Sequence, residues 1–394
     1  MLKDIFLGVL RVGAIVLIIF LFFDGYEKYR SISLYTSLAA WFLLSLATFT
    51  LGFKWKNIAF ISLILLVFSA IVSSSSQGST PAVKILLPLY TMYLMPLMLY
   101  AIVAAAFNGR DKTKLLCTIL ALLGVVRMFY AVFAPASAMP VSAPIDNETA
   151  KNLSLTATFF IPFMFVQYAE GKGVRGILWF IIAILSFAGL LFVGVRASWV
   201  AILCIGFIWT VFLREKRFFS VKLIIISAII ALIMFRFYPA QLHHVREHIV
   251  EQTTISNRLS IWKTTVSISK DSLITGHGLD TALMRDKFVK FAATSGVSPL
   301  LPKQWPDNVF LAILYMQGAV GMFLFAVALL YAIIRLLTIK SDVIGTPNFT
   351  AIAILSAIVA EVVMRVFFFD GNIINLSILL AMAGSVSNKV TISA

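Results

Sequence analysis

The chain has 394 residues, of which 61% are hydrophobic and only 12% are charged, and its formal net charge is +15. A soluble domain is about half apolar and a quarter charged, so this composition excludes an ordinary soluble protein and indicates an integral membrane protein. The basic excess does not indicate nucleic-acid binding, because Lys and Arg are scattered through short loops between apolar blocks, where the positive-inside rule of membrane proteins expects them.

The apolar blocks are continuous rather than alternating, which predicts membrane-spanning helices of about 20 residues each. The first block is followed by Asp24, Gly25 and Tyr26 rather than by a small-residue cleavage site, so we expect it to be retained as a span. We favour twelve crossings within a range of roughly eleven to thirteen. They run approximately over residues 5–23, 32–51, 57–74, 85–107, 115–134, 153–169, 176–195, 198–213, 220–238, 309–337, 348–366 and 372–387.

The tenth block is too long for one simple span and is interrupted by Gly318 and Gly321. Its first part is therefore expected to lie at the membrane surface, or the whole block to form a strongly tilted span.

Basic residues of the short loops gather on one side of this arrangement, which orients the chain. Both termini are expected in the cytoplasm, and the long polar loop then faces the periplasm of a bacterium. Three regions follow: residues 1–238 with nine spans, the loop 239–308 and residues 309–394 with three spans. The expected fold class is thus an all-α, multi-pass protein of the bacterial inner membrane. Cys117 and Cys204 lie in apolar runs, so we expect neither a disulfide framework nor a cysteine metal site.

Arginines from distant parts of the chain are expected at the outer membrane face. Arg196 lies in the short turn between the seventh and eighth spans, and Arg258 lies in the long loop. Arg365 follows Glu361 by four residues, a spacing that allows an ion pair within one helix. Guanidinium groups suit phosphate oxygens, so this set predicts binding of a pyrophosphate-bearing lipid. Arg127 lies deeper in its span and is expected either to pair with a carboxylate or to face a wet cavity.

Candidates for acid–base chemistry are concentrated in the long loop, which holds all four histidines: His243, His244, His248 and His277. His244 and His248 could share a helical face, but no Asp or Glu follows at the spacing of a metal motif, so an amphipathic helix is favoured over a metal site. Asp307 precedes Asn308 at the start of an apolar helix and could act as its N-cap, as a base, or as both. No nucleotide-binding motif occurs, so we expect an activated substrate and no cofactor.

Several short patterns in the chain resemble one family. They are F-F-D-G-Y-E-K-Y near the start, R-A-S-W at Arg196, R-x-x-x-W followed by G-x-G (Arg258, Trp262, Gly276, Gly278), and D-N-V-F-L with a later G-A-V-G over residues 307–321. Together with the segment of Arg365, they resemble the O-antigen ligase and polymerase superfamily of bacterial envelopes, and in particular its enterobacterial O-antigen ligases.

The resemblance implies a metal-independent glycosyltransferase of the GT-C type with twelve spans and a large periplasmic loop. Such an enzyme moves O-antigen from undecaprenyl pyrophosphate to a sugar hydroxyl of lipid A-core, by an inverting displacement. Arg196, Arg258 and Arg365 would then grip the pyrophosphate, and we expect further substrate contacts from Asn308, Arg127, Trp262 and His277.

The family usually has His-Asn where this chain has Asp307-Asn308, and that histidine is regarded as the base. We favour Asp307 in this role, although the ordinary pKa of an aspartate near 4 makes it a weaker base unless burial raises that pKa. His277 could replace it, or base assistance could matter little.

Two other functions stay open. An O-antigen polymerase would use a second lipid-linked glycan as acceptor with the same arginines. A flippase or transporter is disfavoured because no inverted repeat is visible, the single large loop is asymmetric, and the charged residues crowd one face rather than the midplane.

Overall fold

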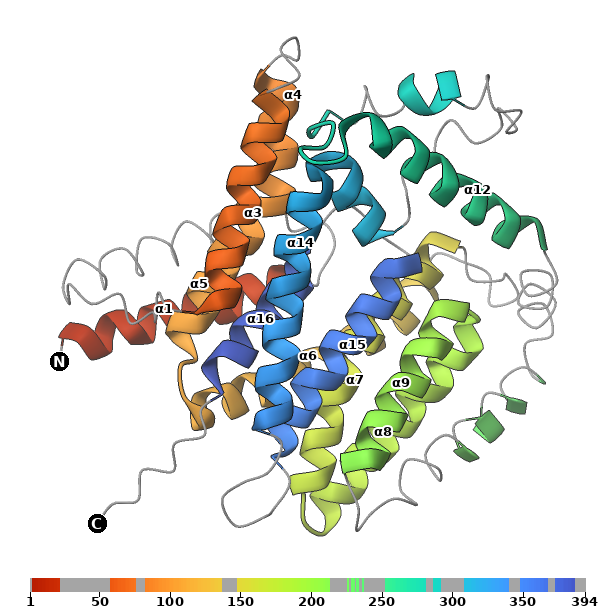
Figure 1. Cartoon of the computed structure of the whole chain (residues 1–394). Helices are drawn as coiled ribbons and strands as arrows, with labels where there is room; N and C mark the ends of the chain where they lie inside the picture. The colour runs from red at the N-terminus through yellow and green to blue at the C-terminus, as the bar shows by residue number, and fades with distance from the viewer. Residues whose placement is uncertain are drawn as a thin grey trace.

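A computed structural model describes residues 2–21, 57–75, 82–136, 147–212, 252–280, 286–291, 308–339, 348–367 and 373–386, together with isolated positions between 225 and 236. These parts of the chain are helical and contain no strand, which confirms the all-α prediction (Figure 1). Four described helices are long and apolar enough to cross a membrane, whereas the total of about twelve spans stays a prediction. These four are α3 (Ile58–Ser75), α8 (Val174–Val193), α14 (Val309–Thr338) and α15 (Phe349–Phe367).

Further helices lie on most of the remaining apolar blocks. They are α1 (Leu2–Leu21), α4 (Ala82–Leu89), the π-helical turn η1 (Tyr90–Leu94), α5 (Met95–Ala106), α6 (Arg110–Ala136), α7 (Asn147–Glu170), α9 (Arg196–Phe212) and α16 (Ile374–Ser385). The long polar loop contributes α12 (Gln252–Ser269) and the short 3-10 turn η3 (Lys270–Ser272). The predicted span 32–51 lies outside the described residues, as does most of 220–238.

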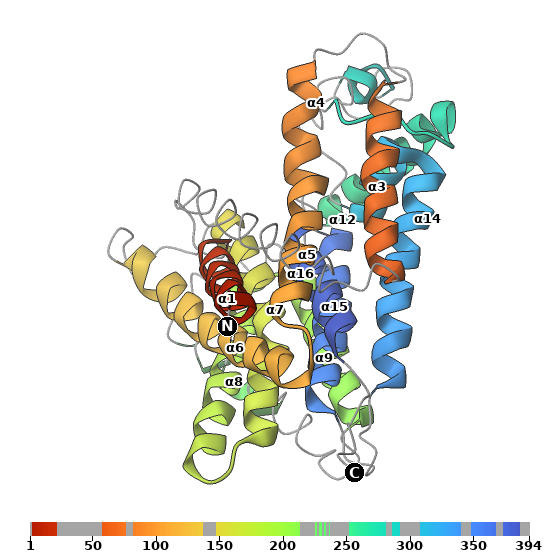
Figure 2. The ribbon, with the colours of Figure 1, turned by 90° about the vertical axis from the view of Figure 1, so that its left-hand side faces the viewer.

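The inner helices of the bundle are α7 and α15, whose side chains are buried along most of their length. Trp209, near the end of α9, stacks on Phe349, the first residue of α15, with ring centroids 6.4 Å apart, and Phe165 of α7 meets the same indole edge-on at 5.3 Å. Because the end of α9 lies beside the beginning of α15, these two neighbouring helices are antiparallel. Helices α3 and α14 run side by side along another flank (Figure 2).

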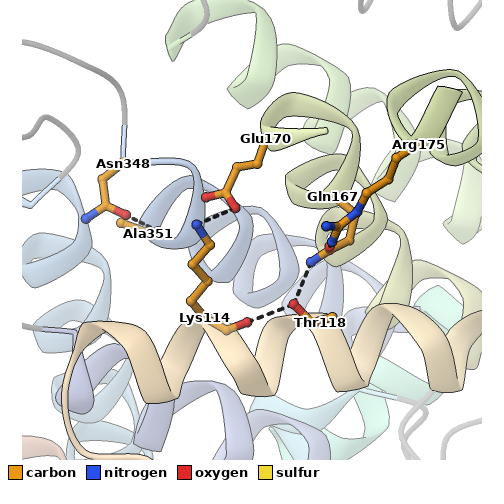
Figure 3. Close-up of polar contacts among 7 residues, drawn as sticks. All are labelled: Lys114, Thr118, Gln167, Glu170, Arg175, Asn348 and Ala351. Atoms are coloured by element: carbon orange, nitrogen blue, oxygen red, sulfur yellow. Dashed lines mark hydrogen bonds and ion pairs between the residues drawn. The ribbon is translucent and has the colours of Figure 1, made fainter. Parts of the chain in front are cut away.

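One end of the bundle is held together by basic side chains, and we call it the basic end (Figure 3). There Lys114 of α6 pairs with Glu170 of α7 at 2.7 Å, and Arg175 donates to the side chain of Gln167 at 3.0 Å. Arg335 of α14 donates to three backbone carbonyls at the end of α16, and Arg11 of α1 donates to the carbonyl of Ala106, the last residue of α5. Cations at helix C-termini satisfy carbonyls that the helix itself leaves open.

The other end of the bundle carries the helix from the polar loop, and we call it the α12 end. In Figure 1, α12 crosses the bundle obliquely above the last turns of α15. Its inward side chains, Ile261, Thr264, Thr265, Ile268 and Ser269, are buried, so the loop helix is packed onto the bundle and is not a detached arm. The candidate site therefore has to be sought between α12 and the helix ends beneath it.

Candidate functional site

Arg196 and Arg365 lie at the same end of the bundle. Helix α8 ends at Gly194, whose φ of 80° is a left-handed conformation that glycine adopts readily, and Arg196 begins α9 directly afterwards. The turn is closed by Ser198, which donates from its backbone N and its Oγ to the carbonyl of Val195 at 3.0 and 2.6 Å. Since α9 and α15 are antiparallel, this start of α9 is level with the end of α15, where Arg365 lies.

Helix α12 brings Arg258 and Trp262 to that same helix end. Both side chains approach one ring: Cζ of Arg258 lies 6.0 Å from the centroid of Phe367, and the ring of Trp262 lies 6.3 Å from it. Phe367 is the last residue of α15, two positions beyond Arg365. The structure therefore gathers three arginines from α9, α12 and α15 at the α12 end, as the sequence analysis expected.

The three arginines differ in how freely they can meet a ligand. Arg365 is 3% exposed, and its Nε donates to Oε1 of Glu361 at 2.8 Å in a pair that is buried on both sides. Arg196 and Arg258 are half-buried. Arg196 and Arg258 are therefore more accessible to an anion than Arg365, which is buried and pairs with Glu361.

Two indole groups add hydrogen-bond donors next to these arginines. The Nε1 atoms of Trp199, three residues after Arg196, and Trp262, four residues after Arg258, are buried, and neither has a hydrogen-bond partner within the described parts of the chain. Buried donors are normally satisfied, so both indoles call for a partner such as water or a bound polar group. Trp199 belongs to the R-A-S-W pattern, but sequence reasoning had not given it a role.

His277 is held on both sides of its ring. Its Nε2 lies 2.8 Å from the carbonyl oxygen of Ile268 at the end of α12, and its Nδ1 lies 2.7 Å from Nζ of Lys287. A carbonyl can only accept, so Nε2 carries the hydrogen, and Nδ1 is left to accept from the lysine ammonium. Burial lowers the pKa of His277 from its ordinary 6.5, and the positive charge of Lys287 acts in the same direction.

This geometry speaks against His277 as the catalytic base. The lone pair that would take a proton already receives the hydrogen bond from Lys287, and the ring is 3% exposed. The histidine instead ties the end of α12 to α14, since its ring also packs against Tyr315 with centroids 4.8 Å apart. Lys287, which sequence reasoning missed, is the partner that fixes this arrangement.

The G-x-G pattern lies in a short loop segment, residues 273–279, that we call the clasp. Its backbone bonds directly to α14: His277 N donates to Tyr315 O at 2.7 Å, and Gly278 N donates to Met316 O at 2.9 Å. The clasp also reaches α3, because Gly278 N and Leu279 N donate to the hydroxyls of Ser73 and Ser74 at 2.9 and 3.2 Å. These contacts join the long loop to two membrane helices.

Helix α14 is broken where the clasp crosses it. Gly318 has φ 67° and ψ −162°, which is not helical, so α14 consists of a short arm, residues 309–317, and a long arm, residues 319–338. The break exposes amides at the start of the long arm, and the clasp supplies their acceptors: Ala319 N donates to Leu273 O at 2.7 Å, and Val320 N to Ile274 O at 3.4 Å. A helix break is tolerated at membrane depth only when such backbone groups find partners.

The predicted interruptions at Gly318 and Gly321 have different outcomes. Gly318 breaks the helix, as expected, and a Cβ there would lie 2.2 Å from the carbonyl oxygen of Ile274. Gly321 is helical, so the prediction that it also interrupts α14 is wrong. Its missing side chain leaves room for that of Gln317, whose Cβ would be only 2.3 Å from a Cβ at position 321.

Asn308 is the N-cap of α14. Its Oδ1 accepts from the backbone N of Phe310 at 2.9 Å and of Leu311 at 3.2 Å, and the residue is buried. This amide therefore fixes the start of the short arm. Asp307 and three of the histidines, at positions 243, 244 and 248, lie outside the described residues, so the roles given to them stay predictions.

Arg127 lies deeper in the bundle than the other arginines. It is buried in α6, next to Met128, whose Sδ accepts from Ser186 Oγ of α8 at 2.9 Å. Ser186 precedes Arg196 by ten residues, which corresponds to about 15 Å along a helix axis. Arg127 is therefore separated from the α12 end and is not part of the arginine group there.

Comparison with known proteins covers the part of the chain that contains much of this candidate site. Residues 181–326 match the model of a family described as O-antigen ligase, and the match runs from α8 through Arg196, α12 and the clasp into the long arm of α14. No curated protein matches the chain. The match confirms the resemblance to the O-antigen ligase superfamily over this stretch. It indicates ligase- or polymerase-type activity, which implies lipid-linked glycan substrates and a membrane environment.

Proposed function

We propose that the protein is a glycosyltransferase that transfers O-antigen polysaccharide from undecaprenyl pyrophosphate to a sugar hydroxyl of lipid A-core. It would work in the bacterial inner membrane, with the α12 end facing the periplasm and both termini in the cytoplasm. The observation that carries the proposal is the gathering of Arg196, Arg258 and Arg365 at this end, because two of these arginines fall within the stretch that matches the O-antigen ligases.

In the proposed reaction the polyprenyl chain lies among the membrane helices and its pyrophosphate reaches the α12 end. Arg196 and Arg258 bind the phosphate oxygens, and their charge stabilises the pyrophosphate as it departs. The acceptor hydroxyl attacks the anomeric carbon from the opposite side, so the configuration inverts. Asp307 takes the hydroxyl proton, and this assistance matters less than charge stabilisation because pyrophosphate is a good leaving group.

The remaining polar groups position these two arginines. The buried pair of Arg365 and Glu361 fixes the end of α15 on which Arg258 rests. The indole N–H groups of Trp199 and Trp262 can donate to oxygens of the pyrophosphate or of the first sugar. No bound metal takes part in this scheme, since the arginines supply the positive charge.

The test combines purified protein, undecaprenyl-pyrophosphate glycan and lipid A-core, with the products separated on a gel. Arg196→Ala and Arg258→Ala are each expected to lower the transfer rate about 10- to 150-fold, because a hydrogen bond to a charged group contributes about 1.5–3 kcal/mol. Arg175→Ala is the matched control, since this arginine lies at the basic end and bonds only to a neutral side chain in Figure 3.

Each product pattern has a definite meaning. Glycan attached to lipid A-core supports the ligase, and full transfer by both arginine variants would exclude the arginine clamp. Lengthened undecaprenyl-linked glycan with untouched lipid A-core would identify a polymerase. A folded protein that transfers nothing but moves lipid-linked glycan across vesicles would identify a flippase.

A further inference from the structure

The outer face of α12 has a pattern that the proposed reaction does not use. Its exposed side chains recur at spacings of four, three and four residues: Leu259, Lys263, Val266 and Lys270. Such spacing places them in one narrow stripe along the helix, opposite the buried side chains that face the bundle. The stripe alternates apolar and cationic residues, and it is followed by the exposed carboxylate of Asp271.

The clasp extends this stripe beyond the end of the helix. Leu273 and Ile274 are 51% and 68% exposed, although both are apolar. Their backbone carbonyls are bonded to Ala319 and Val320 at the start of the long arm of α14, so the position of the two exposed side chains along α14 is fixed.

The long arm of α14 carries an apolar surface that starts at this point. Val320 and Phe323 are 44% and 67% exposed, and the exposed positions continue through Leu330 and Ile334 toward the basic end. Helix α3, which packs along α14, exposes Phe68 and Val72 just before the serines that bind the clasp. Exposed apolar side chains on long apolar helices are those that contact lipid tails in a membrane protein.

We propose that α12 is a membrane-interface helix whose outer stripe lies against the phospholipid headgroups of the leaflet at the α12 end. The exposed Leu273 and Ile274 are bonded to the start of the lipid-facing surface of α14 and follow the stripe in the chain, which places the stripe at the edge of the hydrocarbon layer. Leu259 and Val266 enter the interface, and Lys263 and Lys270 meet the lipid phosphates. The charge favours anionic headgroups.

This placement has a consequence for Arg258, which lies away from the stripe on the same helix. Arg258 is held at the level of the lipid phosphates, which is the level that the pyrophosphate of a membrane-embedded lipid reaches. The inference about α12 does not depend on the reaction, because it rests on the exposed stripe, the exposed clasp residues and the apolar surface of α14.

The test uses the full chain in lipid nanodiscs, with Cys117 and Cys204 replaced by Ala and an environment-sensitive fluorophore on Val266→Cys. Two sites serve as references: Phe207→Cys on α9, which is 70% exposed and apolar, and Lys172→Cys in the turn between α7 and α8. Quenchers are aqueous iodide, and nitroxide lipids labelled either near the headgroup or deep in the tail.

The fluorophore at Val266 is expected to be quenched most by the shallow nitroxide, at Phe207 most by the deep nitroxide, and at Lys172 most by iodide. Quenching at Val266 should be stronger when the shallow nitroxide is carried by an anionic lipid than when it is carried by a zwitterionic lipid. Each lysine is expected to contribute a preference of about fivefold for the anionic lipid. Replacing Lys263 and Lys270 by Gln should abolish this lipid preference.

Two results would overturn the inference. If the fluorophore at Val266 behaves like that at Lys172, the stripe faces water. If it is protected from every quencher and unlabelled Val266→Cys forms disulfide-linked dimers, the stripe is covered by a second copy of the chain.

Discussion

At the scale of single residues, the α12 end contains buried charged groups that are stabilised by specific partners. Arg365 and Glu361 form a pair that is almost completely buried, and Lys287 donates to the one free nitrogen of a buried histidine. Charges in such positions are costly on their own, so each depends on its partner. This dependence gives two predictions that can be measured without a transfer assay.

Glu361→Ala is expected to lower the free energy of unfolding by about 3–5 kcal/mol, because it leaves the guanidinium of Arg365 buried beside a cavity. The double variant Glu361→Leu with Arg365→Met should recover most of this loss, since it removes both charges and keeps similar volumes. Thermal unfolding in detergent checks both. If the double variant is as unstable as the single one, the unpaired charge of Arg365 is not the main cause of the lost stability.

Stability is expected to fall in mild acid because of His277. Burial and the neighbouring Lys287 hold the pKa of His277 in the folded protein below the 6.5 of the unfolded chain. Below pH 6.5 the unfolded chain therefore binds a proton that the folded protein resists, so this contribution is complete at pH 7.5 and is lost as the pH falls toward the lowered pKa.

Unfolding midpoints between pH 5 and 7.5 test this prediction. His277→Gln should flatten the pH dependence, and Lys287→Met should reduce it, because removing the ammonium lets the pKa of His277 rise. Lys290→Met, on an exposed lysine of the same segment, is the control and should keep the wild-type slope. Equal slopes in all four proteins would contradict the assignment of His277.

At the scale of secondary-structure elements, the clasp and the break in α14 form one unit. Gly276 has φ 75°, and a Cβ on it would lie 2.4 Å from the backbone N of Gln317. The backbone of the clasp and the backbone of α14 therefore approach each other more closely than a side chain at position 276 would allow. This close approach is what lets the clasp satisfy the backbone of the broken helix.

Gly276→Ala is expected to lower the free energy of unfolding by about 2 kcal/mol or more, because it adds left-handed strain to a backbone clash. Gly189→Ala in α8 is the matched control. Nothing lies within 4 Å of a Cβ at position 189, and replacing a helical glycine by alanine stabilises by up to about 1 kcal/mol. Chemical unfolding of both variants decides the question, and equal stability would show that the clasp contributes little.

The elements could be predicted from the sequence to different degrees. The described helices lie on the predicted apolar blocks because burial in lipid requires long apolar runs, and Gly318 was recognised as a break in a block that was too long. The clasp could not be foreseen, since its bonds join backbone atoms of Gly278 and Met316, which carry no sequence signal. For the same reason no role was predicted for Ser73 and Ser74, which lie at the end of the predicted span 57–74.

For the candidate site, the sequence predicted that the arginines lie at one end of the bundle, but it did not predict which residues they and His277 contact. The positions of Arg196, Arg258 and Arg365 in the chain placed them at one end, because each lies at a span boundary or in the long loop. The greater depth of Arg127 was also predicted, and the contact between Met128 and Ser186 of α8 agrees with it. The structural role of His277 depends on Lys287, ten residues later in the chain, and no motif relates the two.

At the scale of the whole molecule, the two ends of the bundle differ in charge and in chemistry. The basic end is closed by cations on helix C-termini, and the α12 end carries the loop helix, the clasp and the arginine group. Positive charge on short loops favours the cytoplasmic side, so we expect the α12 end in the periplasm.

Single cysteines on a background without Cys117 and Cys204 test the orientation in intact cells. Asp286→Cys, on an exposed position near the clasp, is expected to react with a membrane-impermeant maleimide added outside the inner membrane. Lys172→Cys, in the turn at the basic end, should react only after the membrane is opened. The reverse pattern would invert the topology, and labelling of both from outside would contradict the two-ended arrangement.

The broken helix also implies an order of events during synthesis of the chain. The amides of the long arm of α14 need the carbonyls of the clasp, and the clasp needs the hydroxyls of Ser73 and Ser74. The end of α3 is made first, then the clasp, and about forty residues later the long arm of α14. The acceptors for Ala319 N and Val320 N are thus synthesised before these amides, so α14 can enter the bilayer already broken without exposing the two amides to lipid.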